Sequence, residues 1–528
     1  TGVMGEASGN AITGLYNSGF GALALYNLAG AASSNTAIGY KAGFQSTTAS
    51  GSVFLGFTAG ETVTTGNKNI AIGHDAMNGS TITGDNNIAI GASAGDALTS
   101  GKENVLIGAD AGGAANSATD TVAVGHNTLS GLTTGVQNIA IGAGALRTTD
   151  DGQQNTAIGH ASMALGNIGN SNTAVGGQTL LYCTNSNNTA VGMQASQFLV
   201  GGAYNVSLGI WAARYVNGSA TGNVSLGSGT LMNAKEGASN ADVDYNIAIG
   251  QNALQGGTLA ADNDLIGNIA IGYNAFKSTG TQNHVGTIAI GYNALTAVTS
   301  GSDNVAVGYQ ALMDMTTGDK NTAVGHEALK NCDDGIYNTA LGYQALTANA
   351  GNNNTGLGYL ALRATTGAQN TAVGMQASHN IGGGANNVSL GMNSLLDVVD
   401  GSQNVAIGSQ AIGGTLGTTA DNASDLIAIG YQAMGGNWEN VSLTDNIAIG
   451  TSAMGGAING AINCIAIGRE TLDGALTTGA NGTVGIGYQA LKYLTTGASN
   501  IAIGFRSLYV HTTGARNIAI GELAMTDT

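Results

Sequence analysis

The chain contains no proline in 528 residues, although proline makes up roughly 5% of an average protein. Proline has no backbone N–H and therefore cannot donate a hydrogen bond to a strand ladder. Its absence is typical of a fold that uses nearly every backbone N–H. The chain also lacks any run of about 20 apolar residues, which excludes a membrane-spanning helix and predicts no membrane insertion.

Charge is scarce as well, with charged residues at 9% of the chain against roughly 25% in ordinary soluble domains. There are 14 Lys and Arg residues against 31 Asp and Glu residues, which gives a net charge of −17. So little positive charge predicts no nucleic-acid partner, because phosphates are neutralised by clustered Lys and Arg. Glycine is abundant at 87 residues, but hydrophobic residues still make up 43% and occupy regular positions, which argues against disorder.

One short sequence word recurs along nearly the whole chain. It reads Asn-x-Ala-Ile-Gly and is followed by Tyr or His, Gln or Asn, Ala and Leu; 28 copies are found, most often 17 residues apart. The fourth position is Ile, Val or Leu in all 28 copies, the first is Asn in 22, and the third is Ala, Ser or Gly in 26, with Phe54 and Leu106 as exceptions. Such regularity indicates that every copy occupies the same environment, as stacking provides.

A unit of this length is too short for helical repeats and suits one coil of a solenoid. The sequence therefore predicts an all-β fold, a parallel β-solenoid (β-roll) of about 28 to 30 coils. Thr-Ala-Ile-Gly reads as a strand. Gln-Ala-Leu and the residues after it fit a second strand or one helical turn, and we favour the strand.

Alternation along the strand predicts two faces. We expect the aliphatic residue at position four to point into a narrow core, opposite the Leu or Met at position nine. Asn, Ala and Gly at positions one, three and five then form a flat outer face against which other chains pack, most simply as a homotrimer. We expect the Asn side chains to form a ladder of stacked amides.

The words at Asn304–Leu312 (NVAVGYQAL) and Asn338–Leu346 (NTALGYQAL) resemble the shaft repeats of bacteriophage tail-fibre proteins. They are also similar to the head repeats of trimeric autotransporter adhesins, in which a similar word marks a shorter coil. The resemblance covers about residues 35–528. It implies a homotrimeric parallel β-roll used for attachment, left-handed as in the adhesin heads. Such tail fibres often end in a trimerisation chaperone; none is recognisable here, so we expect either that it was removed or that the chain trimerises otherwise.

The repeat divides the chain into two parts. Residues 1–34 match the word poorly and are expected to form degenerate cap or junction coils, and residues 35–528 form the repeat domain. The spacing lengthens at 232–245, 255–267, 413–425 and 435–445, where we expect longer loops. Insertions in solenoids often bulge from one binding face, although we favour neutral drift of the loops as the explanation.

The candidate binding residues fall in these loops and in the aromatic column after the word's Gly. From the loops they are Lys235, Glu236, Asp242, Trp438 and Glu439, and from the column Tyr273, Tyr292, Tyr309, Tyr343 and Tyr359. The column is expected to be a stacking ladder that seals an edge, or else an aromatic platform for sugars.

No catalytic or metal motif stands out. Cys183, Cys332 and Cys464 are far apart and predict neither a disulfide framework nor a zinc site. His74 and His126 share the aromatic column but lie three coils apart, too far to chelate one metal within a chain. The acidic residues are scattered, without the paired carboxylates of a glycosidase. We therefore expect no enzyme activity, no cofactor and no metal.

The function expected from the sequence is structural attachment. The chain would form the shaft or receptor-binding body of a trimeric fibre, on a virion tail or an extracellular cell surface. Its partners would be two further copies of itself and a glycan or protein receptor on a host surface. A fibre-borne polysaccharide depolymerase, and an ice-binding or purely structural extracellular filament, remain alternatives.

Overall fold

A computed structural model describes residues 2–4, 13–234, 242–260, 263–413, 422–438 and 443–526. The fold is all-β: a parallel β-solenoid of about 28 coils with a repeat of about 17 residues, as the sequence predicts. The only helix in the described ranges is the 3-10 helix η1 (Thr478–Ala480). No helix in this part of the chain is long and apolar enough to cross a membrane.

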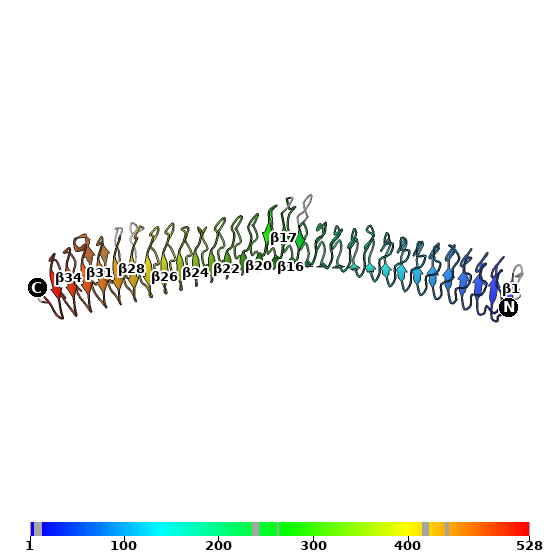
Figure 1. The fold of residues 1–528 in the computed structure, drawn as a ribbon, viewed down its shortest axis with the longest axis horizontal. Coiled ribbons are helices and arrows are strands. Elements are labelled where there is room, and N and C mark those ends of the chain that lie inside the picture. The colour runs from blue at the N-terminus through cyan, green and yellow to red at the C-terminus, as the bar shows by residue number, and fades with distance from the viewer. Residues whose placement is uncertain are drawn as a thin grey trace. The chain divides into compact units, whose positions relative to one another are not determined.

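The chain forms two compact units, Thr1–Asn268 and Ile269–Thr528, shown in blue to green and in green to red in Figure 1. The strands of the first unit are β1 (Gly2–Met4), β2 (Ser18–Phe20), β3 (Thr36–Ile38), β4 (Val53–Leu55), β5 (Ile70–Ile72), β6 (Ile88–Ile90), β7 (Val105–Ile107), β8 (Val122–Val124), β9 (Ile139–Ile141), β10 (Thr156–Ile158), β11 (Thr173–Val175), β12 (Thr189–Val191), β13 (Val206–Leu208), β14 (Val224–Leu226), β15 (Val243–Asp244), β16 (Ile247–Ile249) and β17 (Leu265–Ile266). The strands of the second unit are β18 (Ile269–Ile271), β19 (His284–Val285), β20 (Ile288–Ile290), β21 (Val305–Val307), β22 (Thr322–Val324), β23 (Thr339–Leu341), β24 (Thr355–Leu357), β25 (Thr371–Val373), β26 (Val388–Leu390), β27 (Val405–Ile407), β28 (Ile427–Ile429), β29 (Ile447–Ile449), β30 (Ile458–Asn459), β31 (Ile465–Ile467), β32 (Leu476–Thr477), β33 (Val484–Ile486), β34 (Ile501–Ile503) and β35 (Ile518–Ile520).

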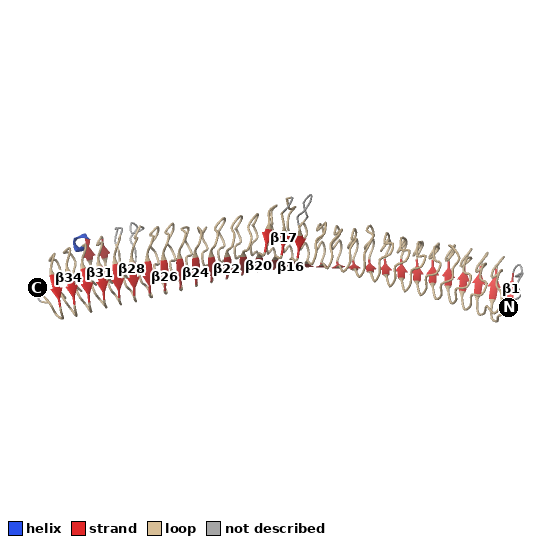
Figure 2. Cartoon of the chain, viewed as in Figure 1, coloured by secondary structure: helices blue, strands red, loops and turns tan. Residues whose placement is uncertain are grey.

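Within each unit the three-residue strands pair in parallel and in register. Thr156 of β10 lies beside Thr173 of β11, and the pairing continues with Ala157 beside Ala174. Each strand of this ladder therefore places equivalent positions of successive words next to each other, which confirms the predicted stacking. Figure 2 shows these strands along one side of the stack in each unit, with loops and turns on the other side.

The expected orientation of the strand is wrong. Position three points into the core and position four points outward: Ala340 is fully buried and Leu341 is 51% exposed. Alternation separates the two faces but does not say which one is inside. The Leu at position nine is buried as expected, and it limits the size of the residue that fits at position three. A Cβ added to Gly356, at position three, would lie 3.3 Å from Cγ of Leu346. A coil this thin accommodates that Leu only opposite a small residue.

Two exceptions at position three show how tightly this core is matched. Phe54 is fully buried, and the two position-nine residues that flank it are Gly43 and Gly60 rather than Leu. A Cβ on Gly43 would lie 2.6 Å from the Phe54 ring, and one on Gly60 would overlap it. Leu106 is likewise flanked by glycines. A large residue at position three is therefore compensated by the loss of side chains at position nine.

The asparagine ladder predicted from the sequence is present, but it lies on the buried side of the coil. The Asn155 backbone N–H donates to Oδ1 of Asn138 at 3.0 Å, and Oδ1 of Asn155 accepts from the Asn172 backbone N–H at 2.9 Å. The Asn155 amide nitrogen donates to the Gly169 carbonyl oxygen at 2.8 Å. Asn155 thus joins its coil to the preceding one through its backbone N–H and to the following one through its side-chain amide, which satisfies groups that would otherwise be costly to bury.

The segment after each word is not the second strand that we favoured. It is a run of turns in which alternate residues take left-handed backbone angles, as at Gln344 (φ +50) and Leu346 (φ +53). The Gln344 N–H donates to the preceding coil, at the His326 carbonyl oxygen (2.8 Å). The Leu346 N–H donates to the following coil, at the Ala361 carbonyl oxygen (3.0 Å). Backbone hydrogen bonds therefore run in both directions along the stack.

The glycine that ends each word has a steric reason. Gly374 has φ +137, and a Cβ added there would lie 2.6 Å from the carbonyl oxygen of Gly391 in the next coil. No side chain fits between backbones this close. The close approach that the small residues permit is thus between successive coils of one chain.

The long loops are described only in part, since residues 235–241, 261–262, 414–421 and 439–442 lie outside the described ranges. In the first unit their described flanks form a second short parallel pair, with Val243 of β15 beside Leu265 of β17. Strands β30 and β32 form a similar pair in the second unit. At the N-terminal end, Asn17 already takes part in the ladder, because its Oδ1 accepts from the Asn35 backbone N–H at 3.0 Å.

Candidate binding surfaces

Six aromatic side chains of the second unit stack into one exposed column. The sequence-predicted tyrosines are all in it, together with His326. Successive ring centroids lie 5.2, 5.4, 4.8, 5.0 and 5.4 Å apart along Tyr273, Tyr292, Tyr309, His326, Tyr343 and Tyr359, which we call the aromatic column. The tyrosines are 41% to 50% exposed. In-register strands space equivalent residues at about 4.8 Å, so the backbone repeat itself brings the rings into contact. The predicted stacking of the rings is confirmed, while sealing of an edge and binding of sugars stay predictions.

A second aromatic stack, in the first unit, was missed by the sequence analysis. Phe198 lies between Tyr182 and Tyr215, with ring centroids 5.4 and 5.3 Å away. The guanidinium carbon of Arg214 is 4.7 Å from the centroid of the Tyr215 ring, in cation–π geometry. The signal was available, since these aromatics recur 16 and 17 residues apart, but outside the repeated word.

The loop candidates do not gather at one place. Trp438 is fully buried, so its indole lines the core and is not available at the surface. Asp242 is exposed, and its backbone N–H donates to Oδ1 of Asp264 at 3.1 Å. Lys235, Glu236 and Glu439 lie outside the described residues.

The outward side of the strand ladder carries a continuous apolar surface in each unit. Positions two and four of successive words point outward there, and most of these residues are Ile, Val or Leu. Ile139 and Ile141 of β9 are both 39% exposed. We call this surface the aliphatic face. Contiguous apolar surfaces of this kind mark sites of association.

Ion pairs join neighbouring coils on the turn side. Nζ of Lys492 lies 2.6 Å from Oε2 of Glu470, and the Gln489 amide nitrogen donates to the same oxygen at 2.7 Å. These hydrogen bonds, led by that of Lys492, lower the pKa of Glu470 to about 2. The carboxylate is therefore stabilised in its charged form and connects two coils through side chains.

The cysteines and histidines provide no metal centre in the described ranges, where no three potential ligands come together. Cys183, Cys332 and Cys464 are unpaired and buried. Burial raises the pKa of Cys183 and of Cys332 to about 11. These thiols are protonated at neutral pH and belong to the core packing.

No protein-family model matches the chain. No curated protein matches it either.

Proposed function

We propose that this chain is a structural attachment protein, the shaft or receptor-binding body of a homotrimeric fibre on a virion tail or an extracellular cell surface. The observation that carries the proposal is the aliphatic face. A solenoid coil with alanines inside buries little apolar surface within the chain, while its outward-facing aliphatic residues remain partly exposed to water. Covering those residues removes apolar surface from water at every coil.

The partner that best covers this face is another copy of the same chain. A surface with one row of side chains per coil, about 4.8 Å apart, is complementary to a surface with the same spacing. Copies arranged around an axis parallel to the stack meet this condition, and the resemblance to trimeric fibres favours three of them.

The aromatic column supplies the attachment surface in this proposal. Its rings are exposed, rigid and repeated, and aromatic faces bind the C–H faces of sugars and apolar parts of protein receptors. In a trimer each column occurs three times. Weak single contacts then add up through effective concentration, which gives avidity without a deep pocket.

The assembly is tested by placing charge on the aliphatic face. Ile141→Glu with Ile158→Glu, on neighbouring strands β9 and β10, should convert a trimer into monomers in sedimentation velocity, while the circular dichroism spectrum is retained. Gln137→Glu is the matched control, because Gln137 is exposed on the same coil but lies outside the aliphatic face. A monomeric unmodified chain at micromolar concentration, or a doubly charged variant that stays trimeric, would contradict the proposal.

Attachment is tested separately on an array of bacterial surface glycans and on intact cells. Tyr309→Ala with Tyr343→Ala should weaken binding by at least tenfold. Tyr337→Ala is the control, because Tyr337 is 50% exposed but stands outside the aromatic column, with Nζ of Lys320 5.4 Å from its ring centroid. No binding to any surface by the trimer, or equal binding by all three proteins, would argue against an attachment role.

A further inference from the structure

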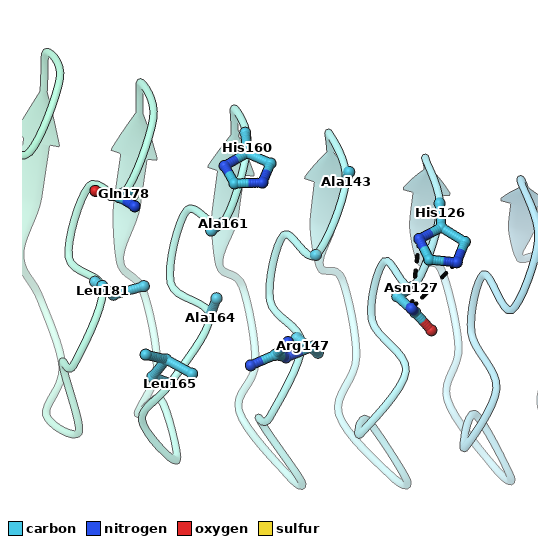
Figure 3. A pocket seen from close by; sticks show the side chains of 11 residues that line it. His126, Asn127, Ala143, Arg147, His160, Ala161, Ala164, Leu165, Gln178 and Leu181 are labelled. Carbon is cyan, nitrogen blue, oxygen red and sulfur yellow. Dashed lines mark hydrogen bonds between the residues drawn. The ribbon is translucent and has the colours of Figure 1, made fainter.

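The first unit contains a hollow of about 370 Å³ on its turn side, within the range of small-ligand pockets. It is lined by His126, Asn127, Ala143, Gly144, Arg147, His160, Ala161, Ala164, Leu165, Gln178 and Leu181. Figure 3 shows the imidazoles of His126 and His160 on coils to either side of the one that carries Ala143. All three residues occupy the position just after the glycine of the word.

The same position elsewhere in this unit shows what the hollow lacks. In the stack of Tyr40, Phe57 and His74, the Phe57 ring lies 5.2 Å from one neighbour and 5.1 Å from the other. Ala143 takes the place of that middle ring. Two coils span about 9.6 Å, so the space between the imidazoles has the width of one inserted ring. The missing side chain, with Gly144 beside it, leaves this space open.

The polar side chains around the hollow are a guanidinium, two imidazoles and two amides. Arg147, on the same coil as Ala143, contributes a guanidinium. The Gln178 side-chain oxygen accepts from the Gln194 amide nitrogen at 2.8 Å, and Figure 3 shows the Gln178 nitrogen turned toward the coil of His160. No carboxylate is among the lining residues, although the chain as a whole carries a net charge of −17. Asp110 is nearby, with Oδ2 4.0 Å from Nε2 of His126.

We propose that this hollow is a binding slot for a pyranose ring that carries a carboxylate, that is, an acidic sugar residue. The ring lies between the two imidazoles, where Phe57 lies in the other stack. Arg147 binds the carboxylate, because its planar fork matches two carboxylate oxygens. The Asn127 amide, on the coil of His126, reaches the hydroxyl groups, and Leu165, on the coil of His160, contacts the C–H edge. An aromatic acid would satisfy the ring and the charge but leave this amide unused.

This inference rests on the proposed attachment function for its purpose, since acidic sugars are units of surface glycans. It is tested with free sugars and the full chain, so that its failure and the failure of attachment are distinguishable. Saturation-transfer NMR and calorimetry are run with glucuronate, glucose and benzoate. We expect glucuronate to bind with a dissociation constant on the order of 1 mM, as a ligand of this size allows. Glucose and benzoate should bind at least tenfold more weakly.

The decisive variant is Ala143→Phe, which places a ring in the slot as Phe57 does in its own stack and should abolish glucuronate binding. Ala92→Phe is the matched control, because Ala92 holds the equivalent position on another coil, outside the hollow, and should leave binding unchanged. Arg147→Met should weaken binding by about 10- to 100-fold, as expected for a lost charge-assisted hydrogen bond.

The assignment is overturned if glucuronate does not bind, if glucose binds as tightly as glucuronate, or if benzoate binds more tightly than glucuronate. It is also overturned if a folded Ala143→Phe variant binds glucuronate as well as the natural chain does. If cells are still bound through the aromatic column while glucuronate is not, the slot is refuted and the attachment role stands. If glucuronate binds but no surface is recognised, the attachment role fails and the slot remains.

Discussion

The matching of Phe54 to two flanking glycines makes a quantitative prediction. Phe54→Ala alone removes a fully buried ring and should destabilise the surrounding coils by about 3–5 kcal/mol, because the cavity is only partly filled by relaxation. Gly43→Leu with Gly60→Leu alone drives two side chains into the Phe54 ring. Overpacking of this kind costs about 1–3 kcal/mol for each residue.

Combining the three substitutions recreates the arrangement found at Ala340, Leu329 and Leu346. Those leucines have φ +51 and +53, close to the +62 and +61 of Gly43 and Gly60, so the new leucines fit the existing backbone. Each regains about 1.5–3 kcal/mol from burial and loses about 1–2 kcal/mol to the left-handed conformation. The triple variant should therefore lie within about 2 kcal/mol of the natural chain, with a coupling free energy of at least about 3 kcal/mol.

The measurement is hydrogen exchange at the amides of β3, β4 and β5, because a long stack of coils does not unfold in one two-state step. A loss of 1.4 kcal/mol should speed exchange about tenfold. Phe54→Ala and the Gly43→Leu with Gly60→Leu variant should each exchange faster, and the triple variant should recover. If the two penalties simply add in the triple variant, the proposed size matching in the core is refuted.

Three further predictions concern the ladder, the glycine column and the ion pairs. Asn155→Ala leaves the buried Asn172 N–H without its acceptor and should lower the local free energy of unfolding by about 2–3 kcal/mol, which speeds hydrogen exchange in β10 and β11 about 100-fold. The control is Asn170→Ala, which removes the equally short but exposed hydrogen bond that Asn170 accepts from the Gln153 N–H. This control should change hydrogen exchange less than threefold. Gly374→Ala should disrupt pairing of β25 with β26, because the new Cβ would press on the Gly391 carbonyl, and unchanged protection there would contradict the steric argument. The pKa of Glu470 is lowered to about 2 from its ordinary value of 4.5, so the stability that its pairing contributes is fully present above pH 4.5 and is lost as the pH falls toward 2. Lys492→Met should move this pKa back toward 4.5 in a carboxyl-carbon NMR titration.

Periodicity explains why so much of the fold could be predicted from the sequence. A short word repeated at nearly constant spacing, in a chain without proline, predicts a stack of coils. The asparagine ladder and the tyrosine stack then follow from the register of the coils alone. What could not be predicted is which side of the strand is inside. Hydrophobicity predicts that Leu341 is the buried residue of its strand, whereas the space beside Leu346 is large enough only for Ala340.

The other errors have similar causes. The turn segment reads as a strand because Gln344 and Leu346 have no preference for left-handed angles; hydrogen bonds to two neighbouring coils impose those angles. The pairing of Phe54 with Gly43 and Gly60 was visible in the sequence, yet its meaning depends on knowing that positions three and nine face each other. Trp438 was chosen for its rarity, which carries no information about exposure.

The backbone bonds of a coil point both ways along the stack, and this has an electrostatic consequence. In the coil of β10, the Thr156 and Met163 N–H groups donate to the coil after it, and the Gly159 and Ala161 N–H groups donate to the coil before it. Their peptide dipoles oppose each other, unlike those of an α-helix, which accumulate into charged ends. Each added coil thus contributes almost no net dipole along the axis. A solenoid of this kind can lengthen by duplication of coils without building up an electric field at its tips.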